Sequence, residues 1–281
     1  MSQPDDSLTV ALVRETFTGP GADARLRQRL GQARDRGAAL AVLPELPLDA
    51  WHPAHAEARP ADAEAPGGRR HQQLAAAAAH AGLGLVGGAI VQDPTTGQRH
   101  NTAVVFDPDG TLSASYRKVH VPWEEGFWER AHFSAGDAPP VPFTGCGWRL
   151  GLQLCSDLQR PQGCLLLGAA GAEAVLSPRA TLEDTWARWR MVIRASAVTA
   201  AVYVLSVTRP GPEAGVPMGG PSVAVDPHGV VVLETTEPLG MVTLEHAVVA
   251  AARQAYPGYL DVRADLYAQG WAALARRGDR G

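Results

Sequence analysis

The chain has 281 residues, of which 46% are apolar, and a formal net charge of -4. This length can bury a substantial core, and the slightly acidic balance without a concentrated basic tract argues against a nucleic-acid or anionic-membrane surface. No apolar run reaches the roughly 20 residues that cross a bilayer, and residues 1–7 are polar and acidic rather than signal-like. The composition therefore predicts a cytoplasmic enzyme or binding protein.

The N-terminal part reads as a strand, a helix and a second strand. Residues 8–13 form a short apolar run rich in β-formers, and residues 39–43 return to that character. Between them, residues 23–37 carry Leu26 and Leu30 at helical spacing and end in glycine. This order predicts a βαβ unit.

Two turns with the pattern Asp-Pro-x-Gly, at 107–110 and 226–229, lie between apolar runs and predict β-hairpins. Residues 46–69 are rich in Pro, Ala and His without periodicity, and read as a long loop. Even composition from end to end predicts a single α/β domain over 1–281. The remaining expected elements are helices over 70–80, 162–170 and 181–200, strands over 83–91, 150–154, 174–176, 202–207 and 241–244, a terminal helix, and an irregular tail at 257–267.

The cysteines and histidines show no pattern typical of a metal site or a disulfide framework. Cys146, Cys155 and Cys164 are odd in number and lack the close spacing of zinc ligands. His52 and His55 form the only close histidine pair, without an accompanying Cys or carboxylate motif. We therefore expect no metal, and the cysteines read as one reactive thiol with two buried bystanders or as three buried residues.

Lysine occurs once, at Lys118, against 24 arginines. A sole lysine indicates a position that needs a compact ammonium rather than a planar fork, with accident in an arginine-rich chain as the alternative. Glu45, Lys118 and Cys155 each follow a predicted strand, where sites assemble in α/β sheets. Taken alone, Glu45 also reads as a solvated turn residue.

The physical logic of this trio is complete if the three side chains converge. The Glu45 carboxylate can take the thiol proton of Cys155, and the Lys118 ammonium favours the thiolate and stabilises an oxyanion. The trio predicts attack on a carbonyl or nitrile carbon, followed by cleavage of the thioester or thioimidate by water.

Six short segments together resemble the nitrilase (carbon–nitrogen hydrolase) superfamily. Three resemble its signature segments, namely Leu43-Pro-Glu45, Tyr116-Arg-Lys-Val-His120 and Gly151-Leu-Gln-Leu-Cys-Ser-Asp157. The other three lie at 127–137, 219–222 and 257–267. The resemblance implies a four-layer αββα sandwich, with mixed sheets and outer helices, paired through those helices into a homodimer.

The same resemblance implies roles for individual residues. Cys155 would be the nucleophile, Glu45 the general base, and Lys118 the stabiliser of the oxyanion. The backbone N–H of Ser156 would assist, and Glu129 would orient Lys118 and the substrate amide. Water completes the reaction, so no metal or organic cofactor is implied.

The segment around Glu129 most resembles the branch that acts on N-carbamoyl amines and related linear amides, which predicts release of ammonia from a small amide or carbamoyl substrate. Relatives that take N-carbamoyl-D-amino acids carry two consecutive arginines where this chain has Leu158-Gln159. Arg160 or Arg179 is the candidate substitute for holding a substrate carboxylate. The alternatives are an ω-amidase, a nitrilase, or a catalytically silent relative serving in binding or assembly.

Further differences from the relatives concern the surroundings of the site. Trp123, Trp128 and His132 share a segment with Glu129 and are expected to wall the pocket, with ordinary loop packing as the alternative. Gln162 stands where many relatives have a carboxylate, and Thr199-Ala200 where they often have Glu-Asn. Both positions are expected near the site and the dimer face.

Overall fold

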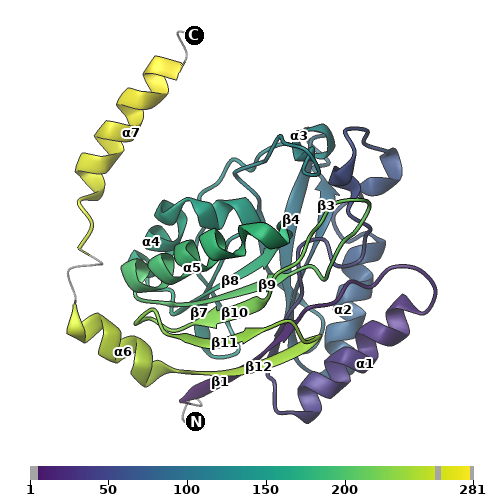
Figure 1. Cartoon of the computed structure of the whole chain (residues 1–281), viewed down its shortest axis with the longest axis horizontal. Helices are drawn as coiled ribbons and strands as arrows, with labels where there is room; N and C mark the ends of the chain where they lie inside the picture. The colour runs from purple at the N-terminus through teal and green to yellow at the C-terminus, as the bar shows by residue number, and fades with distance from the viewer. Residues whose placement is uncertain (1–5, 257–260, 279–281) are drawn as a thin grey trace.

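Two six-stranded mixed sheets stack face to face in the computed structural model, which describes residues 6–256 and 261–278 (Figure 1). The first sheet has the order β12-β1-β2-β3-β4-β5, and the second β11-β10-β9-β8-β7-β6. The strands of the first sheet are β1 (Ser7–Val13), β2 (Leu40–Val42), β3 (Gly84–Gln92), β4 (Arg99–Phe106), β5 (Leu112–Arg117) and β12 (Leu239–Glu245). Those of the second are β6 (Phe143–Gly145), β7 (Trp148–Leu152), β8 (Ala174–Arg179), β9 (Tyr203–Thr208), β10 (Ser222–Val225) and β11 (Val231–Thr235).

Helices cover the outer faces of both sheets, which gives the αββα sandwich expected from the resemblance (Figure 1). The helices α1 (Ala22–Asp35) and α2 (Arg69–Ala81) pack on the first sheet, and α4 (Pro161–Ala169) and α5 (Trp186–Ala200) on the second. The shorter α3 (Glu129–His132) and the C-terminal α6 (His246–Ala255) and α7 (Ala264–Gly278) complete the α-helices of the described residues.

Side-chain alternation along β1 shows why the sheets stack in this way. Leu8, Val10 and Leu12 point into the layer between the sheets, whereas Ala11 and Val13 pack under the outer helices. Because successive side chains of a strand point to opposite faces, a continuous apolar run serves two hydrophobic layers at once. The run at 8–13 is therefore a strand buried on both faces.

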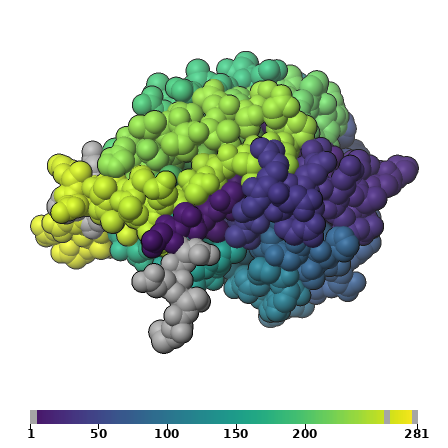
Figure 2. All heavy atoms as spheres, turned by 90° about the horizontal axis from the view of Figure 1, so that it is seen from below, coloured from purple at the N-terminus to yellow at the C-terminus, as the bar shows by residue number. Residues whose placement is uncertain are grey.

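The predicted βαβ unit and both predicted hairpins are confirmed. β1 pairs with β2 in parallel, and β4 with β5 and β10 with β11 in antiparallel. Gly110 and Gly229 have φ of 84° and 81°, the left-handed conformation that these turns require. The late strand β12 pairs with β1, so segments from the two ends of the chain lie side by side (Figure 2).

Three predicted elements differ from the structure. The helix expected at 181–200 begins only at Trp186, because the preceding residues form an extended segment and the 3₁₀ turn η4 (Glu183–Thr185). The strand expected at 150–154 is shifted to 148–152. The tail expected to be irregular enters α7 at Ala264, although its first part, 257–260, lies outside the described residues, as do residues 1–5.

The outer helices and α7 expose apolar side chains. Leu166 on α4 and Met191 on α5 are exposed, and so are Tyr267, Trp271 and Leu274 on α7, which projects away from the sandwich (Figure 1). The homodimer through the outer helices stays a prediction. Within 6–256 and 261–278, no helix has the length and apolar character needed to cross a membrane.

The packing of α4 against α5 provides a test of the second outer layer. A Cβ on Gly168 would lie 2.2 Å from the carbonyl oxygen of Ala200, a backbone atom that cannot yield. We expect Gly168→Ala to lower the free energy of unfolding by roughly 1–3 kcal/mol, as overpacking does, measured by urea denaturation. The control is Gly31→Ala within α1, which meets no atom within 4 Å and should stabilise by about 0.5–1 kcal/mol. Equal effects of the two changes would contradict this account.

Candidate active site

Glu45, Lys118 and Cys155 each follow the end of a strand, as the sequence predicted. Glu45 comes after β2, and Lys118 immediately after β5. β2 and β3 are parallel, and two antiparallel pairings then separate β3 from β5. The carboxyl ends of β2 and β5 therefore lie at the same edge of the first sheet. Cys155 begins the 3₁₀ turn η3 (Cys155–Gln159), which follows β7 of the second sheet.

Lys118 lies between two carboxylates in the interior. Its Nζ donates to Glu45 Oε1 at 2.8 Å and to Glu129 Oε2 at 2.6 Å, and all three side chains are fully buried. The remaining oxygens, Glu45 Oε2 and Glu129 Oε1, are buried and have no hydrogen-bond partner among the described residues. The cluster thus keeps two acceptor atoms available beside the ammonium.

Cys155 lies at the base of a cavity, in a strained backbone conformation. Its φ is +46°, in the left-handed region that costs a residue with a Cβ about 1 kcal/mol or more. The thiol donates to the carbonyl oxygen of Ala180 at 3.2 Å, and the side chain is 4% exposed. Cys155 and Glu129 line the same cavity. The strain is consistent with a side chain that is placed for chemistry rather than for packing.

Burial and the neighbouring charges together set the protonation of Lys118 and Glu129. Burial alone would lower the pKa of Lys118, but Glu129 and Glu45 outweigh it and hold the pKa well above its ordinary value. Burial raises the pKa of Glu129 to about 8, with the nearby Glu45 adding to the rise and Lys118 opposing it. The ammonium therefore stays charged, and the second carboxyl takes up a proton readily.

The thiol is protonated at rest. Burial raises the pKa of Cys155 well above its ordinary value, Glu45 adds to this, and Lys118 lowers it only in part. Lys118 does favour the thiolate, as expected, but the loss of water and the two neighbouring glutamates outweigh this one cation in the resting site. Formation of the nucleophile requires a base at the moment of attack.

Two further residues hold the site together and were assigned no role from the sequence. Asn101 Nδ2 donates to Glu45 Oε1 at 2.7 Å. Asp157 Oδ1 accepts from His120 N at 2.8 Å and Oδ2 accepts from Tyr116 Oη at 2.9 Å, so it fixes the segment on both sides of Lys118. The signal for both was a polar residue within or shortly after a buried apolar segment, Asn101 in β4 and Asp157 in η3, because such a group must find a partner inside.

The cavity above Cys155 has a volume of about 1080 Å³ and carries several arginines. Arg130, Arg160 and Arg188 line it, and all three are exposed. Glu124 is the one exposed carboxylate among the lining residues in the described part of the chain. Arg188 has no ion pair among those residues, so its guanidinium is available to an anion.

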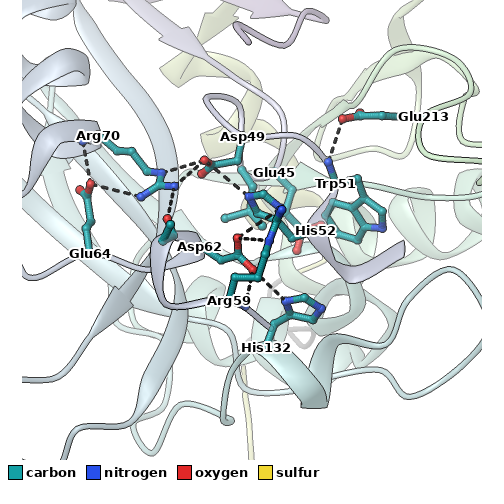
Figure 3. Close-up of polar contacts among 12 residues, drawn as sticks. Glu45, Asp49, Trp51, His52, Arg59, Asp62, Glu64, Arg70, His132 and Glu213 are labelled. Carbon is teal, nitrogen blue, oxygen red and sulfur yellow. Dashed lines mark hydrogen bonds and ion pairs between the residues drawn. The ribbon is translucent and has the colours of Figure 1, made fainter. Parts of the chain in front are cut away.

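Of the predicted pocket residues, Ser156 and Trp123 line the cavity, whereas His132 and Arg179 do not. His132 Nε2 donates to the carbonyl oxygen of His55 at 2.7 Å, and its ring is directed at Asp62 (Figure 3). The prediction of His132 as a pocket wall is wrong, because the second half of α3 faces the 46–69 loop.

Arg179 is a structural residue rather than a substrate ligand. Its guanidinium is fully buried and donates to Ser206 Oγ, Thr181 Oγ1 and the carbonyl oxygen of Pro221. It also lies over the ring of Trp186 at 5.1 Å. The prediction that Arg179 substitutes in carboxylate binding is wrong because each guanidinium nitrogen is engaged within the fold. Arg160 does reach the cavity.

Trp123 and Trp128 pack edge to face with their ring centroids 5.0 Å apart. Trp123 is half exposed and lines the cavity, whereas Trp128 does not.

In the part of the chain that the structure describes, no three His, Cys, Asp or Glu side chains come together as a metal site. Cys146, Cys155 and Cys164 all carry free thiols.

A two-sheet sandwich with a buried carboxylate, ammonium and thiol at one edge defines a hydrolase of the nitrilase superfamily. The chain belongs to the carbon–nitrogen hydrolase family, whose sequence profile matches residues 7–254. It is therefore an enzyme that hydrolyses C–N bonds, and the family predicted from the sequence is confirmed.

Named relatives support this assignment over nearly the whole chain. The human ω-amidase NIT2 is 31% identical over 277 residues, covering 93% of this chain and 97% of its own. An amidase from Nesterenkonia sp. AN1, solved as a double mutant with acrylamide, aligns with a TM-score of 0.79 at 26% identity, over 96% of this chain and 99% of that chain. A carbon–nitrogen hydrolase from Helicobacter pylori G27 shares the fold, with a TM-score of 0.82 at 21% identity over 95% of this chain and 99% of that chain.

The raised pKa of Glu129 predicts a pH dependence of stability. The folded chain binds this proton more tightly than the unfolded chain, so the stabilisation is present below about pH 4.5 and is lost as pH rises toward about 8. Glu129→Gln removes the titrating group. We expect the free energy of unfolding of the variant, relative to that of wild type, to rise between about pH 5 and pH 8 by at most about 1.4 kcal/mol per pH unit. The Tm difference between the two proteins should rise with it.

The control for this experiment is Glu124→Gln, which removes an exposed carboxylate from the same cavity. Its Tm difference from wild type should stay flat over the same range. A flat difference for Glu129→Gln would show that the buried carboxyl does not take up a proton on folding.

Proposed function

We propose that the protein hydrolyses small linear amides that carry a carboxylate at the far end, releasing ammonia through a thioester on Cys155. The observation that carries the chemistry is the buried contact of Lys118 with both Glu45 and Glu129, next to a protonated thiol. The arginines of the cavity support the choice of an anionic substrate.

In the first half-reaction, Cys155 Sγ attacks the amide carbonyl carbon while its proton passes to Glu45 Oε2, the acceptor without a partner. The negative charge that develops on the carbonyl oxygen is stabilised by Lys118 Nζ, with the backbone N–H of Ser156 assisting. Glu129 Oε1 accepts from the substrate N–H. When the C–N bond breaks, Glu45 returns the proton to the leaving nitrogen, and ammonia departs.

In the second half-reaction, water attacks the thioester carbon and gives a proton to Glu45. The S–C bond then breaks, the carboxylic acid leaves, and Glu45 returns the proton to Cys155. A glutamate-to-glutamine variant of the Nesterenkonia amidase shows Michael addition of acrylamide at its active-site cysteine, which supports a thiol nucleophile at the matching place.

A lysine suits this position because an ammonium can lie between two carboxylates and still point a donor at an oxyanion. A guanidinium is a larger planar fork that pairs best with one carboxylate in two-point contact. With both carboxylates within 3 Å of Nζ, an arginine would displace them. This accounts for the presence of a lysine at position 118 in a chain whose other 24 strongly basic side chains are all arginine.

An ω-amide fits the site better than an N-carbamoyl amine. Leu158, at one of the positions where relatives that take N-carbamoyl-D-amino acids have arginines, is fully buried in the core and cannot reach a substrate. The human relative NIT2 and a Saccharomyces cerevisiae relative, NIT3, are named ω-amidases. A carboxylate at the far end of a linear amide would meet Arg188 or Arg160 at the cavity wall.

A screen of ammonia release tests the proposal. We expect turnover of the monoamides of short dicarboxylic acids, weaker turnover of uncharged amides of equal length, and the least with N-carbamoyl amines and nitriles. Cys155→Ala should abolish release, because the nucleophile is lost, while circular dichroism and Tm stay close to wild type. Full activity in this variant would overturn the mechanism, and no turnover across a broad panel would favour the silent-relative alternative.

Arg188 should contribute to the choice of substrate. Arg188→Gln removes a cavity cation that has neither an ion pair nor a side-chain hydrogen bond within the described part of the chain. We expect KM for the dicarboxylic monoamide to rise roughly fivefold, about 1 kcal/mol for a solvent-accessible pair. KM for the uncharged amide should not change. The matched control is Arg190→Gln, on the same helix but paired with Glu234 and outside the cavity. Equal changes for both substrates would place the carboxylate elsewhere.

A further inference from the structure

Arg209 reaches from the second sheet to the turn that carries Glu45. It follows β9 directly and its side chain is fully buried. Nη1 donates to the carbonyl oxygens of Glu45 at 2.8 Å and Leu46 at 2.7 Å, and Nη2 donates to that of Asp49 at 2.9 Å. A single guanidinium therefore holds three backbone carbonyls of this turn.

The turn needs such an external partner. Leu46 has a φ of +47°, which costs a residue with a Cβ about 1 kcal/mol or more. Glu45 and Leu46 are both buried, so a carbonyl oxygen there without a donor would carry the full cost of lost hydration. The backbone direction at Glu45 is thus maintained by contacts from outside the turn.

The charge of Arg209 is balanced without use of the Glu45 carboxylate. Glu213 accepts from Nη2 at 2.6 and 2.8 Å and from Nε at 3.1 Å. Glu213 Oε1 also accepts from the backbone N–H of Trp51 at 2.8 Å, as Figure 3 shows. The ring of Trp51 lies 5.5 Å from the guanidinium carbon. These contacts fix Arg209 and leave Glu45 free to pair with Lys118.

We infer that Arg209 is a positioning residue for Glu45, and this inference rests on the proposed role of Glu45 as the base. Arg209 fixes the Glu45 backbone, so that Oε1 meets Lys118 and Oε2 remains available for the thiol proton. Arg209→Lys would keep the charge, but a single ammonium cannot replace the two terminal guanidinium nitrogens, which together donate to three backbone carbonyl oxygens. Methionine would remove the donors altogether.

The test compares Arg209→Lys and Arg209→Met with wild type in the full chain. Because misplacement of a catalytic group by about 1 Å can cost about 100-fold, we expect kcat to fall about tenfold in the lysine variant and further in the methionine variant. KM should stay within about twofold. The matched control is Arg70→Lys. Arg70 is buried in the same region and donates hydrogen bonds to the Asp49 carboxylate, but it does not contact Glu45 (Figure 3). It should lower Tm and leave kcat within about twofold.

Alkylation of Cys155 by iodoacetamide supplies a readout that needs no known substrate. If Arg209 places the base, the pH profile of alkylation in Arg209→Lys should move from that of wild type toward that of Glu45→Gln. A profile equal to wild type, or an equal loss of kcat in Arg70→Lys at equal loss of Tm, would overturn the inference. Absence of turnover in wild type would instead overturn the proposed function, and the alkylation comparison would still decide the role of Arg209.

Glu213→Gln provides the same comparison in a chain that retains the arginine. It keeps the side-chain volume and weakens the hold on the guanidinium. We expect an intermediate loss of kcat, about threefold, with KM unchanged and an alkylation profile between those of wild type and Arg209→Lys. An unchanged kcat and an unchanged profile would count against a positioning role for this arginine.

Discussion

The structure depends on the burial of one ammonium group, that of Lys118, between two carboxylates and away from water. Each of these ions loses its hydration inside the protein, and mutual attraction repays that cost only if geometry is held closely and the other atoms are satisfied. Lys118 meets Glu45 and Glu129 within hydrogen-bond distance at zero exposure. With Cys155 as a third acidic group nearby, one cation cannot neutralise every ionised form at once. Proton transfer among these groups is therefore favoured over permanent charge separation.

The support for this cluster comes from elements far apart in the sequence. Asp157 fixes the backbone on either side of Lys118, Asn101 binds Glu45, and Arg209 crosses from the other sheet to the same glutamate turn. None of these residues needs to touch a substrate to affect chemistry. Their common property is a buried polar group that bonds to a segment distant in the sequence, from β4 for Asn101, from η3 for Asp157 and from the residue after β9 for Arg209.

Local patterns predicted the framework well, because strand alternation, helix spacing and Asp-Pro-x-Gly turns act within a few residues. The convergence at the sheet edge was also predictable, since Glu45, Lys118 and Cys155 all follow strands. Predictions failed where tertiary contacts decide. His132 shares a four-residue helix with Glu129, yet its ring is bound by His55 and Asp62. The sequence around Arg179 does not predict that its guanidinium donates hydrogen bonds to Ser206, Thr181 and Pro221.

The burial of the sole lysine, Lys118, also determines how the protein responds to reagents and enzymes that modify lysine amines. Acetylation, methylation and ubiquitination of side chains require an accessible ε-amino group, and the sequence offers one such group, which is fully buried and held as an ammonium by two carboxylates. The permanently charged cations at the surface are arginines, and lysine-directed modifications do not act on arginine. The folded protein is thus closed to lysine acylation and to lysine-based cross-linking, and labelling at this side chain would report unfolding.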